Sequence, residues 1–289
     1  MKISFITDEV TQSLEEAIAF ARKHRMQGVE LRSVEGLTLE QADRETLKGW
    51  KKQLDAAHLC VSNLATSFFK CDLTRENVEN EIEKLELLCD AADILECHTL
   101  RGFSFFASPE HACSMEKLES CFSEPLEILA RRQKILLLEA DPSVNITNHT
   151  GLRDLLDRLA CPQLGAVYDP GNDIYDPAGE KPYPDGYLAV QKYIRHIHIK
   201  DACRNSRGEI GCVCMGRGEV DYSGLMEAVV RSGYSGWLSL EPHYRKGTVL
   251  TEAQMRMPRG SEFSQGGMEA AAESLEALRA MLRKQGVEV

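Results

Sequence analysis

Short apolar runs alternate with longer amphipathic stretches along the whole chain. Eight of the runs are rich in Ile, Leu, Val or aromatic residues and stop at a polar residue, a pattern typical of buried strands. The predicted strands span residues 3–7, 28–32, 59–64, 94–101, 135–140, 165–169, 194–200 and 237–241. The stretches between them predict helices at residues 14–26, 40–57, 76–91, 114–132, 152–159, 185–193, 223–232 and 267–284.

Helix-start signals precede three of these predicted helices. Ser13 comes three residues before Glu16, which is the spacing of a capping box. Thr74 precedes the helix at 76–91, and Thr147 or Asn148 precedes the helix at 152–159. Such side chains accept hydrogen bonds from the free N–H groups of a first helical turn, so we expect the helices to begin there.

Strands that alternate with helices predict a parallel sheet with helical crossovers. The continuous apolar run at residues 135–138 suits a parallel strand that is buried on both faces. A doubly wound open sheet is the competing architecture, but it normally carries a Gly-rich phosphate loop after an early strand, and residues 6–9 (Ile-Thr-Asp-Glu) form no such loop. The sequence therefore predicts the α/β class and a single (β/α)8 TIM barrel domain over residues 1–289. The irregular stretches 171–184 and 243–266 follow strands, where the active-site loops of a barrel lie.

Composition and length agree with a globular barrel. The chain has 289 residues, of which 43% are hydrophobic, and no apolar run approaches the about 18–20 residues that span a bilayer. The N-terminus enters a strand at once and reaches an acid at Asp8, unlike a signal peptide, so a cytoplasmic location is expected. The ten cysteines are scattered through the chain, and we expect reduced, structural thiols.

The charge balance bears on the partner. The net charge is −11, from 45 acidic and 34 basic residues, and no basic cluster is present that would neutralise nucleic-acid phosphates. We therefore expect a small-molecule, sugar-like substrate and neither a nucleic acid nor a membrane as partner. A homo-oligomer is possible, with the segment 243–266 as a lid or a subunit contact.

Four residues at the ends of the last four predicted strands suggest a metal site: Glu139, Asp169, His198 and Glu241. The carboxyl ends of barrel strands form one ring, so these side chains should converge. Three carboxylates and one imidazole suit Mn²⁺, Mg²⁺, Co²⁺ or Zn²⁺. Each carboxylate ends an apolar run, where burial is costly unless a cation offsets it. Any one of them alone would more simply be a helix cap or half of an ion pair.

Two further histidines lie near this set. His196 points to the same face of its strand as His198 but one layer lower, where a hydrogen-bonded core histidine is expected. His243 follows the last strand, and exposure, support of the site and substrate contact all stay open for it.

The chain resembles the sugar phosphate isomerase/epimerase family of the xylose-isomerase-like (AP endonuclease 2-type) TIM barrel superfamily. The segments that carry the resemblance are residues 3–10, 28–32, 168–172, 196–201, 216–222 and 240–243. The resemblance implies that Glu139, Asp169, His198 and Glu241 ligate one divalent metal ion, with Mn²⁺ favoured over Zn²⁺, Co²⁺ or Mg²⁺. It also implies that the two glutamates flank the substrate carbon on opposite faces as an acid/base pair.

The resemblance further implies substrate contacts at Asn172, Lys200, Arg217 and Glu30. Lys200 and Arg217 would bind substrate oxygens or a phosphate, and the simpler alternative for each is a salt bridge to a nearby acid. Glu30 has an equally simple alternative as an ion-pair partner of Arg32 or Arg101.

Together these features predict a metal-dependent isomerase or epimerase of a small sugar, sugar phosphate or related polyol ketone. Proton removal beside a carbonyl would pass through an enediolate that the metal stabilises. A dehydratase of an inosose- or shikimate-type ketone would use the same first step, and a non-catalytic sugar-binding barrel is a further alternative.

An abasic-site endonuclease is disfavoured because its extra zinc ligands are missing. Position 172 is Asn rather than His, and residues 204–215 contain no Asp-x-His pair. The third predicted strand also ends without a histidine.

Overall fold

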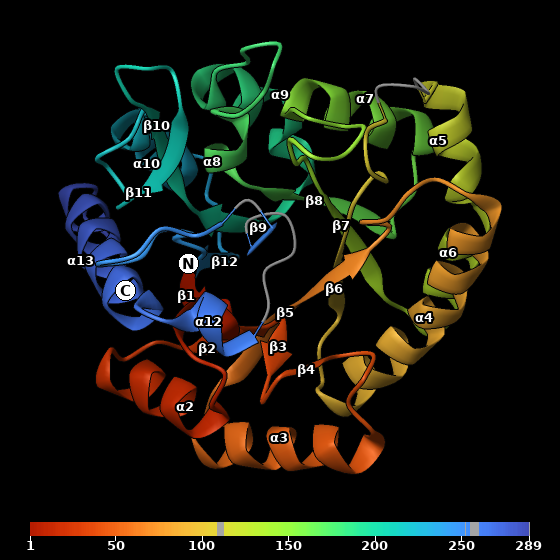
Figure 1. The fold of residues 1–289 in the computed structure, drawn as a ribbon, viewed down its shortest axis with the longest axis horizontal. Helices are drawn as coiled ribbons and strands as arrows, with labels where there is room; N and C mark the ends of the chain where they lie inside the picture. Colours follow the sequence, from red (N-terminus) through yellow and green to blue (C-terminus); the bar gives the residue numbers. More distant parts are fainter. Residues whose placement is uncertain (109–112, 252, 255–259, 289) are drawn as a thin grey trace.

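The computed structural model describes residues 1–108, 113–251, 253–254 and 260–288. Eight parallel strands form a nearly closed barrel inside a ring of helices, which confirms the predicted fold class (Figure 1). The barrel strands are β1 (Lys2–Phe5), β2 (Gly28–Leu31), β5 (Cys60–Phe68), β6 (Thr99–Gly102), β7 (Ile135–Glu139), β8 (Leu164–Tyr168), β9 (Ile194–Ile199) and β12 (Trp237–Leu240).

The strands pair in the order β1-β12-β9-β8-β7-β6-β5-β2. At the seam between β1 and β2, an isolated bridge joins Ile6 to Glu30, and the N–H of Gln27 donates to the carbonyl of Ile3 at 3.2 Å. All the ladders in this sheet are parallel, so the carboxyl ends of the strands lie at one end of the barrel.

The long helices surround the strands. They are α2 (Leu14–Lys23), α3 (Arg44–Ala56), α4 (Arg75–Ile94), α5 (Met115–Cys121), α6 (Ser123–Arg132), α7 (His149–Leu159), α10 (Tyr222–Arg231) and α13 (Gly267–Lys284). Shorter turns are α1 (Thr7–Val10), α8 (Pro170–Asp173), η1 (Pro182–Gly186), α9 (Tyr187–Val190), η2 (Gln191–Tyr193) and α12 (Gly260–Ser264). Among the described residues, no helix is both long enough and apolar enough to cross a bilayer.

Several predicted bounds are wrong. The strand predicted at 94–101 starts only at Thr99, because α4 continues to Ile94. The helix predicted at 114–132 is two helices, α5 and α6, because Pro125 has no N–H to donate to the carbonyl of Cys121, where α5 ends. The helix predicted at 185–193 is a succession of π, α and 3-10 turns.

The helix-start predictions hold with one refinement. Ser13 caps α2 by accepting from the N–H of Glu16 at 3.3 Å, and Thr74 caps α4. The carboxylate of Glu16 accepts from Thr11 rather than returning to Ser13, so the capping box is only half formed. Asn148, not Thr147, caps α7.

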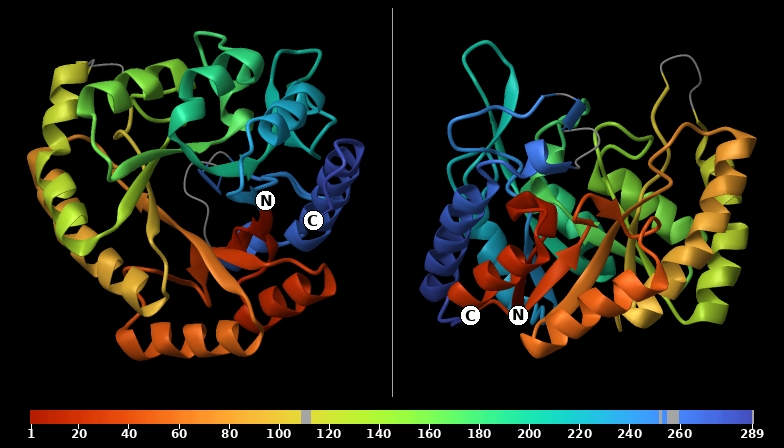
Figure 2. Two further views of the ribbon diagram at one scale, coloured as in Figure 1. Left: turned by 180° about the vertical axis from the view of Figure 1, so that it is seen from behind. Right: turned by 60° about the horizontal axis from the view of Figure 1, so that its bottom comes forward.

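Two antiparallel hairpins were not predicted. One joins β3 (Ser33–Val34) to β4 (Leu37–Thr38), and the other joins β10 (Asp201–Arg204) to β11 (Ile210–Val213). Their strands are two to four residues long, too short for a pattern of alternation to be evident. The β10–β11 hairpin projects from the end of the barrel opposite the two chain termini (Figure 2).

The amino ends of the strands are closed by packing. A Cβ added to Gly28 would lie 2.7 Å from the ring of Trp237 and 2.6 Å from the carbonyl oxygen of Cys60. Glycine is therefore required beside the indole, and the carboxyl ends of the strands are left to form the site.

Candidate metal centre and active site

The four predicted ligands converge at the carboxyl ends of β7, β8, β9 and β12. One ligand atom from each of Glu139, Asp169, His198 and Glu241 lies within 4.8 Å of the others, and all four residues are buried. They meet because consecutive strand ends are neighbours in the barrel.

His198 directs one ring nitrogen at the carboxylates. Its Nδ1 lies 3.2 Å from Glu139 Oε1, 3.0 Å from Glu241 Oε2 and 3.8 Å from Asp169 Oδ2. Its Nε2 points the other way and lies 3.3 Å from Glu30 Oε1. One lone pair of the imidazole can therefore face a cation while the opposite N–H is hydrogen-bonded.

Asp169 divides its two oxygens between the fold and the site. Oδ1 accepts from the N–H groups of Gly171 and Asn172 at 2.9 and 3.3 Å and so caps α8. Oδ2 is buried and accepts no hydrogen bond, although the Nζ atom of Lys200 lies 2.6 Å away as an ion pair. A buried carboxylate oxygen without a hydrogen bond, facing an imidazole and two more carboxylates, fits a divalent metal ion.

Charges in the site are strongly coupled. Burial opposes ionisation of Glu139 and Glu241, but the cationic neighbours outweigh it and hold the pKa of each carboxyl below its usual value. Arg101 is the main such neighbour of Glu139, and Lys200 is that of Glu241. Burial also opposes protonation of His198, yet the surrounding glutamates raise its pKa well above the usual value. The carboxylates therefore favour a positive charge among them. When no metal ion is bound, a proton on His198 supplies that charge.

Two arginines hold the glutamate oxygens that do not face His198. Arg101 Nη1 donates to Glu139 Oε2 at 3.0 Å and lies 3.7 Å from Glu241 Oε1. Arg32 Nη1 donates to Glu241 Oε1 at 3.0 Å. Each glutamate thus has one oxygen on the His198 side and one oxygen fixed by a guanidinium.

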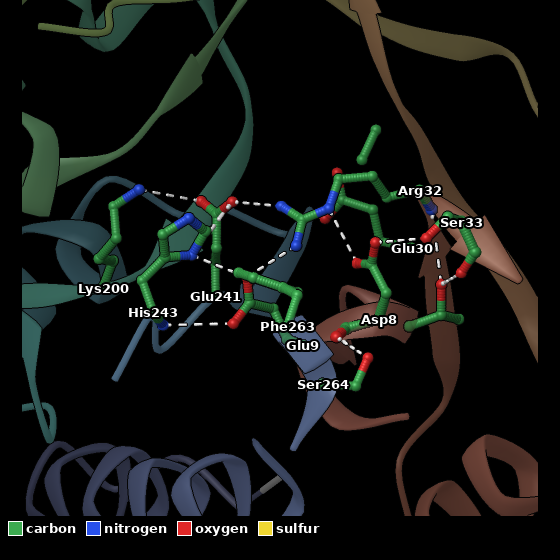
Figure 3. A network of polar contacts seen from close by, with 12 residues as sticks. Asp8, Glu9, Glu30, Arg32, Ser33, Lys200, Glu241, His243, Phe263 and Ser264 are labelled. Atoms are coloured by element: carbon green, nitrogen blue, oxygen red, sulfur yellow. Dashed lines mark hydrogen bonds and ion pairs between the residues drawn. The ribbon is translucent and has the colours of Figure 1, made fainter. Parts of the chain in front are cut away.

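Arg32 is itself anchored across the barrel seam. It donates to Asp8 and to Glu9 at 2.8 Å each, so one guanidinium joins α1 to Glu241 (Figure 3). On its other side Glu9 accepts from Arg245 at 3.1 Å and lies 2.7 Å from Nδ1 of His243. His243, whose role was open, is buried in this network, which excludes an exposed position.

A cavity of about 600 Å³ is lined by two of the four candidate ligands, Glu139 and Glu241, whereas Asp169 and His198 are fully buried and are not among the described residues that line it. Of the residues predicted from the sequence it is lined by Glu139, Glu241, Asn172 and Lys200. Its walls also carry Arg32, Lys70, Arg101, Phe103, Tyr175 and His243. Asn172 Nδ2 donates to the carbonyl of Ala140 at 2.9 Å and lies 3.4 Å from Glu139 Oε1, which holds this amide at the cavity wall. The volume suits a small, polar ligand.

Two predicted substrate contacts lie elsewhere. The Arg217 side chain is 69% exposed and pairs with Glu273 at 3.0 Å. It lines a second cavity, between β11 and residues 243–250, that shares Tyr175, Cys212 and His243 with the first. Glu30 is fully buried beneath the candidate ligands and is not among the described residues that line the main cavity. His196 is buried and hydrogen-bonded to Glu30, as expected of a core histidine.

Arg32, Arg101 and Lys70 were not predicted as site residues. Arg32 lies two positions after Glu30 on the second predicted strand, and Arg101 ends the fourth. The rule that identified the carboxylates, a charged residue closing an apolar run, would have identified these two arginines also. Lys70 lies beyond β5 and gave no such signal.

The sequence model of the family described as "xylose isomerase-like TIM barrel" matches residues 18–281, so the chain belongs to this family. Three similar solved structures are an IolI protein with a bound zinc atom, the probable 3-DHS dehydratase AsbF from Bacillus anthracis, and D-allulose 3-epimerase from Methylomonas sp. in complex with D-allulose. They are 16%, 18% and 16% identical to this chain, with TM-scores of 0.75, 0.72 and 0.74.

The matches extend over nearly the whole of each chain. The three alignments cover 98%, 96% and 97% of this chain and 99%, 98% and 97% of the other. At this level of identity the likeness establishes the fold. No curated protein sequence matches the chain.

Proposed function

We propose that this protein is a divalent-metal-dependent isomerase or epimerase of a small sugar, sugar phosphate or related polyol ketone. The observation that carries the proposal is the convergence of Glu139, Asp169, His198 and Glu241, two of which, Glu139 and Glu241, line a cavity of about 600 Å³. The bound zinc in the IolI protein and the bound D-allulose in the Methylomonas epimerase support a metal and a sugar ligand for this fold. Mn²⁺ is the metal proposed, with Zn²⁺, Co²⁺ and Mg²⁺ as alternatives.

When bound, the metal ion would polarise the carbonyl and hydroxyl oxygens of the substrate and stabilise the negative charge that develops on them. Glu139 Oε1, Asp169 Oδ2, His198 Nδ1 and Glu241 Oε2 are the atoms proposed to hold it. Lys200, at 3.1 Å from Glu241 Oε2, would donate to a substrate oxygen beside this set. Asn172 would present its amide from the cavity wall beside Glu139, and Arg217 would act only if the substrate extends to the second cavity.

The proton transfers are assigned to the two glutamates. Both glutamates line the main cavity, so a substrate bound there has a carboxylate from each within reach. A substrate carbon held between them can lose its proton to one carboxylate and regain a proton from the other. If the proton returns to the opposite face of the same carbon, the product is an epimer. If the proton returns instead to the neighbouring carbonyl carbon, and the hydroxyl that remains gives up its own proton to become the new carbonyl, the product is an aldose–ketose isomer.

Deuterium wash-in tests this proposal without knowledge of the product. The protein loaded with Mn²⁺ is incubated in D₂O with ketoses, their phosphates and inosose-like ketones, and the quenched mixtures are analysed by proton NMR after metal removal. Loss of the proton beside the carbonyl reports proton abstraction, and a chelator should abolish it while the circular dichroism spectrum of the barrel is retained. No exchange with any of these compounds would contradict the proposal.

Glu241→Gln separates an enzyme from a sugar-binding barrel. Exchange should fall by at least about 10²-fold, because an amide cannot accept the proton. Glu40→Gln is the matched control, since Glu40 lines the same cavity but has no place among the candidate ligands. A binding protein would retain its ligand and exchange no proton in either form. Loss of water with a new enone absorbance would identify the dehydratase alternative.

A further inference from the structure

Glu30 occupies a layer of the barrel directly beneath the candidate metal site. Its side chain is fully buried and its two oxygens have three partners. Oε1 accepts from Asn63 Nδ2 at 2.9 Å and lies 3.3 Å from His198 Nε2, while Oε2 lies 2.9 Å from His196 Nε2. Among the described residues, each partner of this carboxylate is a nitrogen that can donate a hydrogen bond.

This arrangement fixes which nitrogen of His198 is available to a cation. An ionised carboxylate accepts only, so the nitrogen facing Glu30 must carry the proton. The remaining nitrogen, Nδ1, is the one that faces Glu139, Asp169 and Glu241. A histidine that donates one N–H to a carboxylate is held in orientation and becomes a more basic ligand at its other nitrogen.

A second metal ion is the competing explanation for the same residues. Glu30, His196 and His198 also have ligand atoms within 4.8 Å of one another. However, the separations of 2.9 and 3.3 Å between oxygen and ring nitrogen are hydrogen-bond lengths between a donor and an acceptor. Glu30 Oε1 already accepts a hydrogen bond from Asn63 Nδ2 at 2.9 Å. A metal ion bound between Glu30 and the histidines would have to share this oxygen with Asn63.

We infer that Glu30 is a positioning residue, which holds His198 through Nε2 so that Nδ1 is presented to the metal ion. This inference rests on the proposed metal site and gives Glu30 a role other than substrate contact. The carboxylate acts through His198, because Glu30 is not among the described residues that line the main cavity. The effect should therefore appear in metal affinity before it appears in substrate affinity.

The test measures binding of Co²⁺ and Zn²⁺ to the purified full chain by calorimetry, without any substrate. Glu30→Leu removes the acceptor at similar volume and should raise the dissociation constant by about 10–100-fold, the usual effect of losing such a partner. Glu30→Gln keeps an oxygen for His198 and Asn63 but loses the charge, so its dissociation constant should lie between those of wild type and Glu30→Leu. If Glu30→Leu fails to fold, Glu30→Gln carries the test.

A control variant separates positioning from general loss of structure. Glu81→Gln neutralises another buried carboxylate, which lies on α4 and accepts from the N–H of Phe69 directly after β5. This variant should lower stability without lowering metal affinity.

A spectroscopic signature reports on the contact itself. In the Zn²⁺-loaded protein the His198 Nε2 proton should resonate far downfield and exchange slowly with water, because it is donated to a buried carboxylate. In Glu30→Leu this signal should move upfield or disappear through exchange.

The possible results of these measurements distinguish failure of this inference from failure of the proposed function. Unchanged affinity and an unchanged proton signal in both Glu30 variants, with normal metal binding by the wild type, would overturn this inference alone. Two bound ions in the wild type and one in Glu30→Leu would make Glu30 a ligand and overturn it as well. Failure of the wild type to bind any divalent ion would instead overturn the proposed function, and the inference with it.

Discussion

The two halves of the barrel contribute different kinds of residue to the candidate metal site. The carboxyl-terminal strands β7, β8, β9 and β12 supply all four candidate ligands. The amino-terminal strands supply the groups that hold those ligands. Arg32 follows β2, Arg101 lies on β6, and Glu30 on β2 binds His198 from below.

The arginines from the amino-terminal half hold the two glutamates in place, while Lys200, directly after β9, is the main cation that keeps Glu241 ionised. Each glutamate has one oxygen toward His198 and one oxygen held by an arginine from the opposite half. The four ligands of the carboxyl-terminal half should therefore determine whether a metal ion binds. In the amino-terminal half, Glu30 should adjust the metal affinity through His198, whereas the two arginines should determine how well the bound site works.

The largest effect is expected from the ligand half. Asp169→Asn keeps an oxygen to cap α8 but loses the charge on Oδ2, so metal affinity should fall by at least about 10²-fold, more than the loss of an outer partner costs. Metal analysis after gel filtration measures the bound ion. Asp173→Asn is the matched control, because Asp173 is a buried neighbour that pairs with His149 and should leave the metal content intact. Full metal content in Asp169→Asn would count against the assignment.

A smaller effect, and of another kind, is expected from the arginine half. Arg101→Met should lower turnover by about 10²-fold through misplacement of Glu139 and Glu241, with metal content unchanged. Parallel measurement of deuterium exchange and bound metal checks both statements. Arg153→Met, at a surface ion pair with Asp154, should change neither. If Arg101→Met lost its metal together with its activity, the two halves would not be separable.

Metal affinity should depend on pH with a definite sign. The carboxylates raise the pKa of His198 in the metal-free protein, so a proton and the metal ion compete for Nδ1. Below that pKa the affinity should rise by about tenfold per pH unit and level off above it. Titrations with Co²⁺ between pH 6 and pH 8 (roughly the working range of a histidine ligand) test this. A dissociation constant that does not change over the range would contradict it.

The smallest effect concerns stability at the junction of the halves. Asp141, after β7, lies 2.8 Å from Lys70, after β5. Burial raises the pKa of Asp141, but Lys70 outweighs it and lowers the pKa to about 2. Because the folded pKa is depressed, the stabilisation is present above the unfolded value near 3.9 and is lost as pH falls toward 2.

Asp141→Asn should therefore cost about 2 kcal/mol at neutral pH, the equivalent of the shift. Its unfolding free energy should also depend less on pH in the acid range than that of the wild type. Chemical unfolding at several pH values checks both. Equal acid sensitivity in the two proteins would show that Lys70 does not stabilise the carboxylate.

The sequence was sufficient for the barrel and for the candidate ligands, and the reason is physical. Buried parallel strands produce apolar runs, and a carboxylate that ends such a run, as Glu139 does, is conspicuous because its burial is costly. Pro125 is equally visible in the sequence, and a proline inside a predicted helix indicates the break that divides 114–132. The partners of Glu30 cannot be read from the sequence, because Arg32 and Arg101 both offer a charge of the right sign. Its actual partners are Asn63 on a neighbouring strand and His196 and His198, which lie more than 160 residues away.

The position of Arg217 was unpredictable for a related reason. Its loop carries the expected motif, but its direction depends on packing against Glu273 of α13, which no local pattern encodes. Side chains on regular strands can be placed from alternation, whereas those on connecting loops cannot.

The seam of the barrel has an evolutionary consequence. Between β1 and β2 the backbones are joined by the bridge from Ile6 to Glu30 and by the hydrogen bond from Gln27 to Ile3, and the ion pairs of Arg32 with Asp8 and Glu9 span the same gap. The guanidinium of Arg32 therefore both joins the two sides of the seam and orients the carboxylate of Glu241. A homologue that replaces this arginine would have to alter positions 8 and 9 in concert, so the three sites should covary as a unit.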